Sequence, residues 1–225
     1  MNILAVVAHP DDEILGCGAT LLRLKNEGHR IFTVVLCADA DARRDRPSDL
    51  SRYAVEAAQM IGVDETENGG FANVRFNVVP HIEMVQFIEK AILRFRPSWI
   101  FTHHPSDLNV DHRVCYETTM AAARLPQRLT EDVPVTMIER IYLCEVPSST
   151  DWGLPLSVPF QPNSFFNVSA TIDQKIRALE HFRGALKPAP HTRSKENVRA
   201  LAHVRGGEVG LEAAEAFVLV RHVTL

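Results

Sequence analysis

The strongest constraint on the fold is an apolar run at the start of the chain that ends abruptly in charged residues. Residues 3–8 (Ile-Leu-Ala-Val-Val-Ala) have the composition of a buried strand, and residues 9–13 (His-Pro-Asp-Asp-Glu) follow directly. Unpaired carboxylates are too costly to bury in a core, so this cluster needs a cation, hydrogen-bonding partners or water. In open α/β sheets, ligands bind at the carboxyl ends of the strands. The pattern therefore predicts a polar site at the edge of such a sheet.

A second polar cluster follows a second apolar run in the same way. Residues 99–101 (Trp-Ile-Phe) lead to residues 103–112, which read His-His-Pro-Ser-Asp-Leu-Asn-Val-Asp-His. The carboxyl ends of parallel strands lie along one edge of a sheet, so we expect the two clusters to meet there. The simplest account of two such His/Asp clusters is one metal site that they share.

Strand-like and helix-like segments alternate through the first half of the chain, and the second half is less regular. Expected strands span residues 2–8, 30–37, 74–79, 98–102, 138–146 and 216–221. Expected helices span residues 13–27, 48–61, 81–95, 112–124, 170–183 and 194–204, the last broken at 205–207 (Arg-Gly-Gly). The alternation predicts an α/β fold with a mostly parallel sheet and helices on both faces, in a single domain over residues 1–225. Loops at 39–47, 147–163 and 184–194 are expected to form the pocket walls.

Composition excludes several classes of protein. Charged residues make up 23% and hydrophobic residues 46% of the 225 residues, as in ordinary globular proteins, and the net charge of −4 does not favour nucleic-acid binding. No apolar stretch approaches the ~20 residues of a membrane span, and the chain start lacks the basic region of a signal peptide. The four cysteines form no CxxC pair and are expected to be reduced. These features favour a cytoplasmic protein.

Three residues of the two clusters suit a metal ion. His9, Asp12 and His112 offer nitrogen and oxygen ligands of the kind that zinc prefers, and such a set leaves a position for water or substrate. Asp11 then points elsewhere and is placed to act as general base toward an attacking water. The alternative is a hydrogen-bonded polar knot that caps the first helix. A cap explains one acid, but it does not explain three consecutive acids and a matching cluster downstream.

Other polar residues are expected to border the site without a settled role. They are Glu13, Asn109, Asp111, His104 and His191. Glu13 is expected to interact with the helix dipole or with the metal ligands from outside, and Asp111 to orient an imidazole or hold a neighbouring loop. Asn109 and Asp107 are assigned to a turn in the pocket wall. His191 and Arg193 either close over the site or belong to a plain loop.

The motif Ala8–Glu13, followed by residues 16–18 (Gly-Cys-Gly) and later by Asp111-His112, resembles the LmbE/PIG-L family of metal-dependent N-deacetylases. The resemblance extends over most of the chain and includes residues 205–206 and 214–217. It implies a Rossmann-like sheet and removal of an acetyl group from an N-acetylated amino sugar or sugar conjugate. It also implies one zinc ion held by His9, Asp12 and His112, with Asp11 as general base. Relatives are often homo-oligomers.

One position departs from the family pattern. Several relatives have a histidine three residues before the last metal ligand, which stabilises the oxyanion or acts as an acid. Asn109 stands at that position here. The proton donor to the leaving amine is therefore open between Asp11 acting twice and a histidine such as His104 or His191, while Asn109 can still donate a hydrogen bond.

The sequence thus predicts a zinc-dependent amidohydrolase, with two alternatives. A magnesium enzyme that handles phosphate would prefer oxygen ligands, which His9 and His112 do not supply. A catalytically inactive module that binds metal or sugar is suggested by Asn109. Other divalent ions also suit the donor set, and the acetylated substrate is not identified by these residues.

Overall fold

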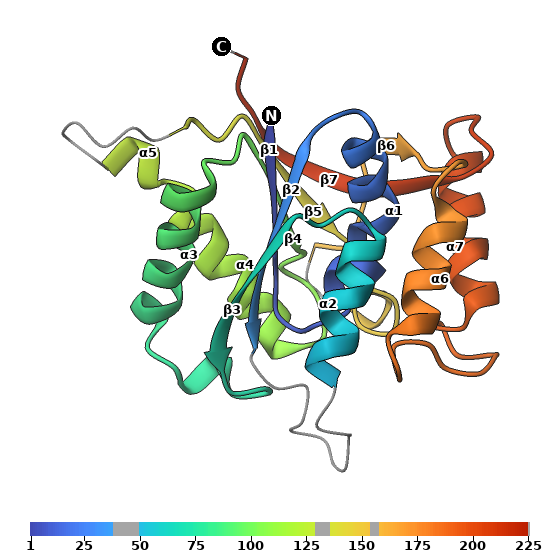
Figure 1. Cartoon of the computed structure of the whole chain (residues 1–225), viewed down its shortest axis with the longest axis horizontal. Coiled ribbons are helices and arrows are strands. Elements are labelled where there is room, and N and C mark those ends of the chain that lie inside the picture. Colours follow the sequence, from blue (N-terminus) through green and yellow to red (C-terminus); the bar gives the residue numbers. More distant parts are fainter. Residues whose placement is uncertain (38–49, 129–135, 154–157, 225) are drawn as a thin grey trace.

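The computed structural model describes residues 1–37, 50–128, 136–153 and 158–224, with only the backbone described at residues 50 and 51. Within these ranges, seven strands form one sheet in the order β3-β2-β1-β4-β5-β7-β6, and helices cover both of its faces (Figure 1). The α/β fold predicted from the alternation of segments is confirmed. The predicted loop at 39–47 lies outside the described residues.

The strands are β1 (Asn2–Val7), β2 (Arg30–Cys37), β3 (Glu65–Phe71), β4 (Trp99–His103), β5 (Arg140–Cys144), β6 (Ser164–Asn167) and β7 (Ala214–His222). The helices are α1 (Asp12–Asn26), α2 (Leu50–Met60), α3 (His81–Phe95), α4 (Val110–Ala122), α5 (Leu125–Arg128), α6 (Ile172–His181) and α7 (Lys195–Gly207). Two short 3₁₀ helices are η1 (Phe76–Val78) and η2 (Thr150–Trp152).

The first five strands are parallel, and the strand order reverses direction at β1. β1 pairs with β2 on one side and with β4 on the other, whereas β7 runs antiparallel to both β5 and β6. The connection from β1 leads outward through β2 to β3, and the chain then returns to place β4 on the other side of β1. The crevice between the carboxyl ends of β1 and β4 is therefore the topological switch point, where open α/β sheets bind ligands.

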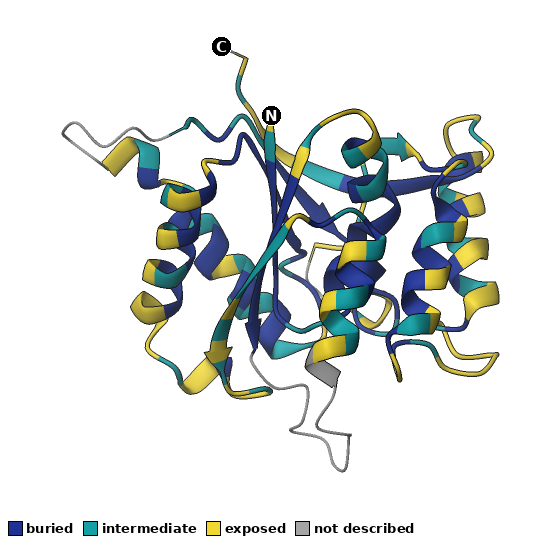
Figure 2. Cartoon of the chain, viewed as in Figure 1, coloured by how far each residue is buried: buried dark blue, intermediate teal, exposed yellow. Residues whose placement is uncertain are grey.

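The central strands are buried on both faces, which explains why their sequences are apolar without alternation. In β1, Ile3 and Ala5 pack in the cluster that contains α1 and α6, while Leu4 and Val6 pack in the cluster beneath α3 and α4. Figure 2 shows the buried strands at the centre and exposed residues on the outer faces of the helices. Helix α1 lies very close to the sheet, because a Cβ atom at Gly16 would meet the Cβ atom of Cys144 at 3.0 Å.

The strand predicted at residues 74–79 is wrong. The edge strand lies earlier, at Glu65–Phe71, and residues 76–78 form the 3₁₀ helix η1. β3 pairs only with β2 and is half-exposed, so its sequence (Glu-Thr-Glu-Asn-Gly-Gly-Phe) lacks the apolar pattern of a buried strand. Phe76 is apolar because it packs in the core, where it is 1% exposed. The edge strand β6 was not predicted because its four residues are too few to show a strand pattern.

Helix α7 also continues past its predicted end. It runs through Gly206 to Gly207, where the sequence predicted a break. A Cβ atom at Gly206 would lie 2.6 Å from the carbonyl oxygen of Leu211, so this glycine allows close packing instead of ending the helix.

All four cysteines are buried free thiols, as expected. Among the described residues, no helix has the length and apolar composition needed to cross a bilayer.

Candidate metal centre at the switch point

Three side chains from the two predicted clusters converge beyond the ends of β1 and β4. The Oδ2 atom of Asp12 lies 3.2 Å from Nδ1 of His9 and 3.2 Å from Nε2 of His112, and the two nitrogens are 3.3 Å apart. Ligands bound tetrahedrally to zinc at about 2.0–2.1 Å are about 3.3 Å from one another. The triad of His9, Asp12 and His112 therefore has the donor atoms and the spacing of one face of a tetrahedral metal site.

A tight turn after β1 brings the first two members together. The backbone N–H of Asp12 donates to the carbonyl of His9 (3.2 Å), and the N–H of His9 donates to the carboxylate of Asp12 (2.9 Å). Asp11 lies between them with φ of 106° and precedes α1. His112 is in the first turn of α4, which begins soon after β4. The third member thus comes from the other side of the switch point.

A second carboxylate lies behind each imidazole. Oδ2 of Asp111 is 3.1 Å from Nε2 of His9, and Oδ2 of Asp107 is 3.1 Å from Nδ1 of His112. In metal sites, such carboxylates hold the ring in place and make its other nitrogen a better ligand. The sequence anticipated that Asp111 would orient an imidazole, but it assigned Asp107 only to the pocket wall.

Both of these carboxylates are themselves held by hydrogen bonds. Asp111 accepts from the backbone N–H groups of Val74 (2.6 Å) and Phe76 (3.2 Å), so it also holds the loop before α3. Asp107 accepts from the hydroxyl groups of Ser149 and Thr150, the latter at 2.7 Å. Sequence reasoning missed Ser149 and Thr150, because nothing in residues 147–163 marks which of its polar side chains turn inward.

The electrostatics of the cluster favour a cation. Burial alone would lower the pKa of His9, but its contacts with Asp111 and Asp12 raise it to about 9. Burial would likewise lower the pKa of His112, but the charge of Asp12 and the hydrogen bond with Asp107 raise it to about 10. Burial opposes the ionisation of Asp12, yet the neighbouring His112 holds its pKa well below the usual value. Three carboxylates around two imidazoles thus stabilise positive charge at the point where the donor atoms meet.

His103 packs against the triad and is not among its three donors. Its ring stacks on that of His112 with centroids 4.0 Å apart, and its Nε2 accepts the backbone N–H of Ala8 (2.9 Å). Burial, and then the charge of His112, lower the pKa of His103 to about 3. This histidine is therefore neutral, and its acceptor nitrogen is already used.

Asp11 lies outside the triad and meets residues from two other parts of the chain. Its Oδ2 atom lies 3.4 Å from Nη1 of Arg193, in the loop before α7. Its backbone N–H donates to Oε2 of Glu13 (3.2 Å). Burial raises the pKa of Glu13 to about 8. Glu13 thus holds the backbone of the turn and is not among the three converging donors.

The remaining predicted residues do not contact the donor atoms of the triad within the described structure. Oδ1 of Asn109 accepts the N–H of Asp111 (3.0 Å), which makes it the N-cap of α4. Nδ1 of His104 lies 2.7 Å from Oγ of Ser106, and its ring meets that of Phe160. His191 is exposed, and its Nδ1 accepts the N–H of Arg193 (3.0 Å). Of the late-loop pair, Arg193 rather than His191 reaches the site.

Backbone strain concentrates around the same point. Among the described residues, four other than glycine have positive φ: Asp11, Val74, Arg96 and Ser148. Arg96 is the ordinary C-cap of α3. The other three border the site, since Val74 donates to Asp111 and Ser148 contacts Arg193. Strained backbone of this kind persists mainly at functional sites, so it marks the switch point independently of the side-chain chemistry.

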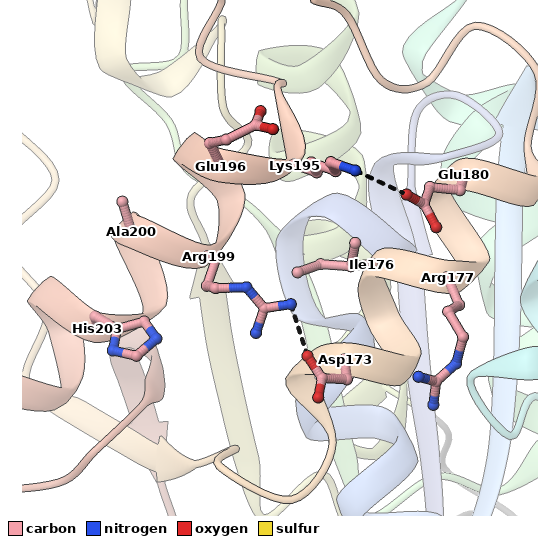
Figure 3. A pocket seen from close by; sticks show the side chains of 9 residues that line it. All are labelled: Asp173, Ile176, Arg177, Glu180, Lys195, Glu196, Arg199, Ala200 and His203. Atoms are coloured by element: carbon pink, nitrogen blue, oxygen red, sulfur yellow. Dashed lines mark ion pairs between the residues drawn. The ribbon is translucent and has the colours of Figure 1, made fainter. Parts of the chain in front are cut away.

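One cavity borders the motif, and a larger one lies elsewhere in the molecule. The first, of about 150 Å³, lies beside the motif between Pro10 and Glu13 on one side and residues of α2 and β3 on the other. A larger groove of about 540 Å³ lies between α6 and α7, and four of its charged side chains form two ion pairs, Asp173 with Arg199 and Glu180 with Lys195 (Figure 3). Neither cavity is lined by a member of the triad, but the smaller one borders the motif through Pro10 and Glu13.

Comparison with known proteins places these residues in context. The family described as "PIG-L: GlcNAc-PI de-N-acetylase" matches residues 4–123. The chain is 33% identical over 143 residues to "Uncharacterized deacetylase YaiS" of Escherichia coli (strain K12), covering 61% of this chain and 76% of that protein. The matched family region spans the whole triad.

Solved structures share the fold over nearly the full length. The conserved protein TT1542 from Thermus thermophilus is 28% identical, with a TM-score of 0.80 over 99% of this chain and 96% of that one. GalB, a 4-carboxy-2-hydroxymuconate hydratase from Pseudomonas putida KT2440, is 17% identical, with a TM-score of 0.82 over 100% and 98%. The N,N'-diacetylchitobiose deacetylase from Pyrococcus horikoshii is 18% identical, with a TM-score of 0.75 over 98% and 84%. The last two likenesses show the fold alone.

Proposed function

Because the chain belongs to the GlcNAc-PI de-N-acetylase (PIG-L) family, we propose that it is a metal-dependent hydrolase that removes the acetyl group from an N-acetylated amino sugar or sugar conjugate. The single observation that carries the proposal is the convergence of His9, Asp12 and His112 at 3.2–3.3 Å from one another. The curated relative YaiS, itself described as a deacetylase, supports the same reaction class.

The triad is proposed to hold one divalent ion, with zinc the best match to two imidazoles and one carboxylate. Such an ion supplies Lewis-acid chemistry, which polarises an amide carbonyl and lowers the pKa of water. Asp107 and Asp111 keep the two imidazoles turned so that Nδ1 of His9 and Nε2 of His112 point at the same spot. Three protein ligands would leave one position of a tetrahedral ion for water or substrate.

Asp11 is proposed to carry the protons. In hydrolysis, a C–O bond forms between water and the acetyl carbon, the C–N bond breaks, and one proton moves from the water to the amine nitrogen. Asp11 is next to the triad without belonging to it, so its carboxylate takes the proton from water and returns it to the nitrogen. Asn109 caps α4, His104 is hydrogen-bonded to Ser106 and His191 is exposed, so Asp11, which directly precedes Asp12 in the chain, is preferred for that role.

A hydratase is the second candidate, since GalB has the same fold over the full length of this chain. Adding water to a carbon–carbon double bond also needs an activated water and a base, and one fold hosts both reactions. The imidazole ligands argue against a magnesium enzyme that handles phosphate, as they did in the sequence.

Acetate release decides between these functions. The purified protein is incubated with a panel of N-acetylated sugars and glycoconjugates, after chelation and again after zinc is added back. We expect acetate and a free amine in equal amounts, with loss of activity on chelation and recovery with metal. Hydration of an unsaturated tricarboxylate without any acetate release would support the hydratase, and no activity toward either class with full metal content would support a binding module.

A further inference from the structure

The triad and Asp11 lie in the N-terminal half of the chain, but the side chain of Arg193, from the C-terminal half, contacts Asp11. We propose that Arg193 is a positioning residue that holds the carboxylate of Asp11 in the orientation required for proton transfer. The role rests on the proposed function, because it acts through Asp11. Neither the family match, which ends at residue 123, nor the motif itself includes this arginine.

The guanidinium of Arg193 is fixed by three contacts in two directions. Its Nε donates to the carbonyl of Pro147 (3.0 Å) and to Oγ of Ser148 (2.7 Å), and its Nη1 donates to Oδ2 of Asp11 (3.4 Å). The side chain is 20% exposed. Because the guanidinium is planar, anchoring Nε sets the direction of Nη1. The contact with Asp11 is therefore anchored by the segment that follows β5.

The loop that carries Arg193 is itself tied down. The N–H of Lys187 donates to the carbonyl of Arg193 (3.1 Å), and the N–H of Ser194 donates to that of His191 (2.8 Å). Ser194 is fully buried and caps α7 by accepting the N–H of Asn197 (3.2 Å). Arg193 thus lies directly before the N-cap of a helix, and its backbone has little freedom to move away from Asp11.

Both side-chain partners of Arg193 have strained backbones. Asp11 has φ of 106° and Ser148 has φ of 72°, and neither is a glycine. Such conformations persist when the surroundings over-determine them. The Arg193 guanidinium joins these two positions, which lie on segments following β1 and β5. The arrangement is typical of a preorganised site and not of an incidental surface ion pair.

The physical need for this contact follows from the neighbour of Asp11. Asp12 is proposed to bind a cation, and the carboxylate of Asp11 is one residue away, so that cation also attracts it. Arg193 offers a competing positive group, which keeps one oxygen of Asp11 occupied and the carboxylate turned toward the proton that it is to accept. Misplacing a reacting group by about 1 Å costs on the order of 100-fold in rate.

The test is a set of variants on the full chain loaded with zinc. Arg193→Ala is expected to lower kcat by roughly 10- to 100-fold while KM and zinc content stay within twofold. Arg193→Lys should restore only part of the rate, since an ammonium group does not reach Ser148 and Asp11 in a fixed fork. Arg199→Ala, in the helix that follows and paired with Asp173, is the matched control and should leave kcat unchanged.

A double-mutant cycle separates positioning from other roles. In an Asp11→Asn background, Arg193→Ala should cause no further loss of rate, because there is no carboxylate left to position. A raised KM with unchanged kcat, or an additive loss in that background, would overturn the proposal in favour of substrate binding. Loss of zinc in Arg193→Ala would overturn it as well.

The same four proteins give a readout without turnover. The shifts in Tm caused by Asp11→Asn and Arg193→Ala should be non-additive if the two side chains are coupled. A wild-type protein that releases no acetate while its Tm shifts are coupled contradicts the deacetylase but keeps the contact. An active wild type with additive Tm shifts contradicts the role of Arg193 and leaves the deacetylase intact.

Discussion

Helix α1 carries two buried polar clusters, and they are built on opposite principles. At its N-terminus, the carboxylates of Asp12, Asp107 and Asp111 surround the imidazoles of His9 and His112. In its middle, one lysine meets one glutamate. The first cluster carries an excess of negative charge, whereas the second is neutral as a whole.

The middle cluster is complete without any added group. Nζ of Lys175 donates to Oε1 of Glu215 (2.7 Å) and to the carbonyl of Leu15 (2.7 Å). Glu215 also accepts from the N–H groups of Ala19 (3.2 Å) and Thr20 (2.7 Å) in α1. Both charged side chains are 7% exposed, and their opposite charges and hydrogen bonds satisfy one another. This pair joins α1, α6 and β7 and has a structural role.

The difference shows how to separate a functional from a structural cluster of buried charges. A structural cluster balances its charges internally, because unpaired buried charge is costly. The cluster at the switch point does not, so it is stable only with positive charge at its centre, from protons on the imidazoles or from a metal ion. Each prediction below removes one member of one cluster or its neighbour.

The largest effect is expected for His9→Ala. Removing a nitrogen ligand should reduce the bound zinc from about one ion per chain to near none and bring acetate release to background. Elemental analysis of the purified protein measures this directly. His203→Ala, an exposed histidine of α7, is the control and should keep its metal. Full zinc content in His9→Ala would show that His9 is not a metal ligand.

Asp11→Asn should separate chemistry from metal binding. Loss of the general base is expected to lower kcat by ~10²–10⁴-fold while the zinc content stays that of the wild type. Rates of acetate release and elemental analysis on the same sample check both parts. Equal loss of metal in Asp11→Asn and His9→Ala would show that the two residues do not have separate roles.

Lys175→Met tests the structural cluster. It leaves Glu215 buried without its cation, so the free energy of unfolding should fall by about 3–5 kcal/mol, as measured in urea. The double variant Lys175→Met, Glu215→Leu should recover most of that loss, because no buried charge is left unpaired. Both variants should retain zinc at temperatures where they are folded. A loss of zinc in the folded protein would mean that the two clusters are coupled through α1.

Asp107→Asn is expected to have the smallest effect, on the tuning of the metal site. The carboxylate contacts His112 and not the shared donor point, so its loss should weaken zinc affinity by about 10- to 100-fold without abolishing binding. Competition with a chelator of known affinity measures the change. An affinity within twofold of wild type would show that the ring of His112 is held well enough without the charge, for example by Ser149.

Local patterns predicted much of this molecule. The helix at 81–95 matches α3 residue for residue, and the strand at 30–37 matches β2, because periodicity and breakers lie within those segments. Edge strands were the exception. β3 has a sheet partner on one side only and its residues are mostly polar, and β6 is only four residues long, so no local pattern marks either strand.

Composition and spacing within short segments predicted the parallel sheet and the two polar clusters at strand ends, because short segments set local structure. The meeting of His9, Asp12 and His112 followed from the rule that parallel strands end at one edge of the sheet, where ligands bind. Long-range packing was needed to establish that Asp111 holds His9 and that Arg193 reaches Asp11 across 182 positions of the chain. Such contacts depend on how the loops pack at the switch point, and a contact between distant segments leaves no periodic signal in either of them.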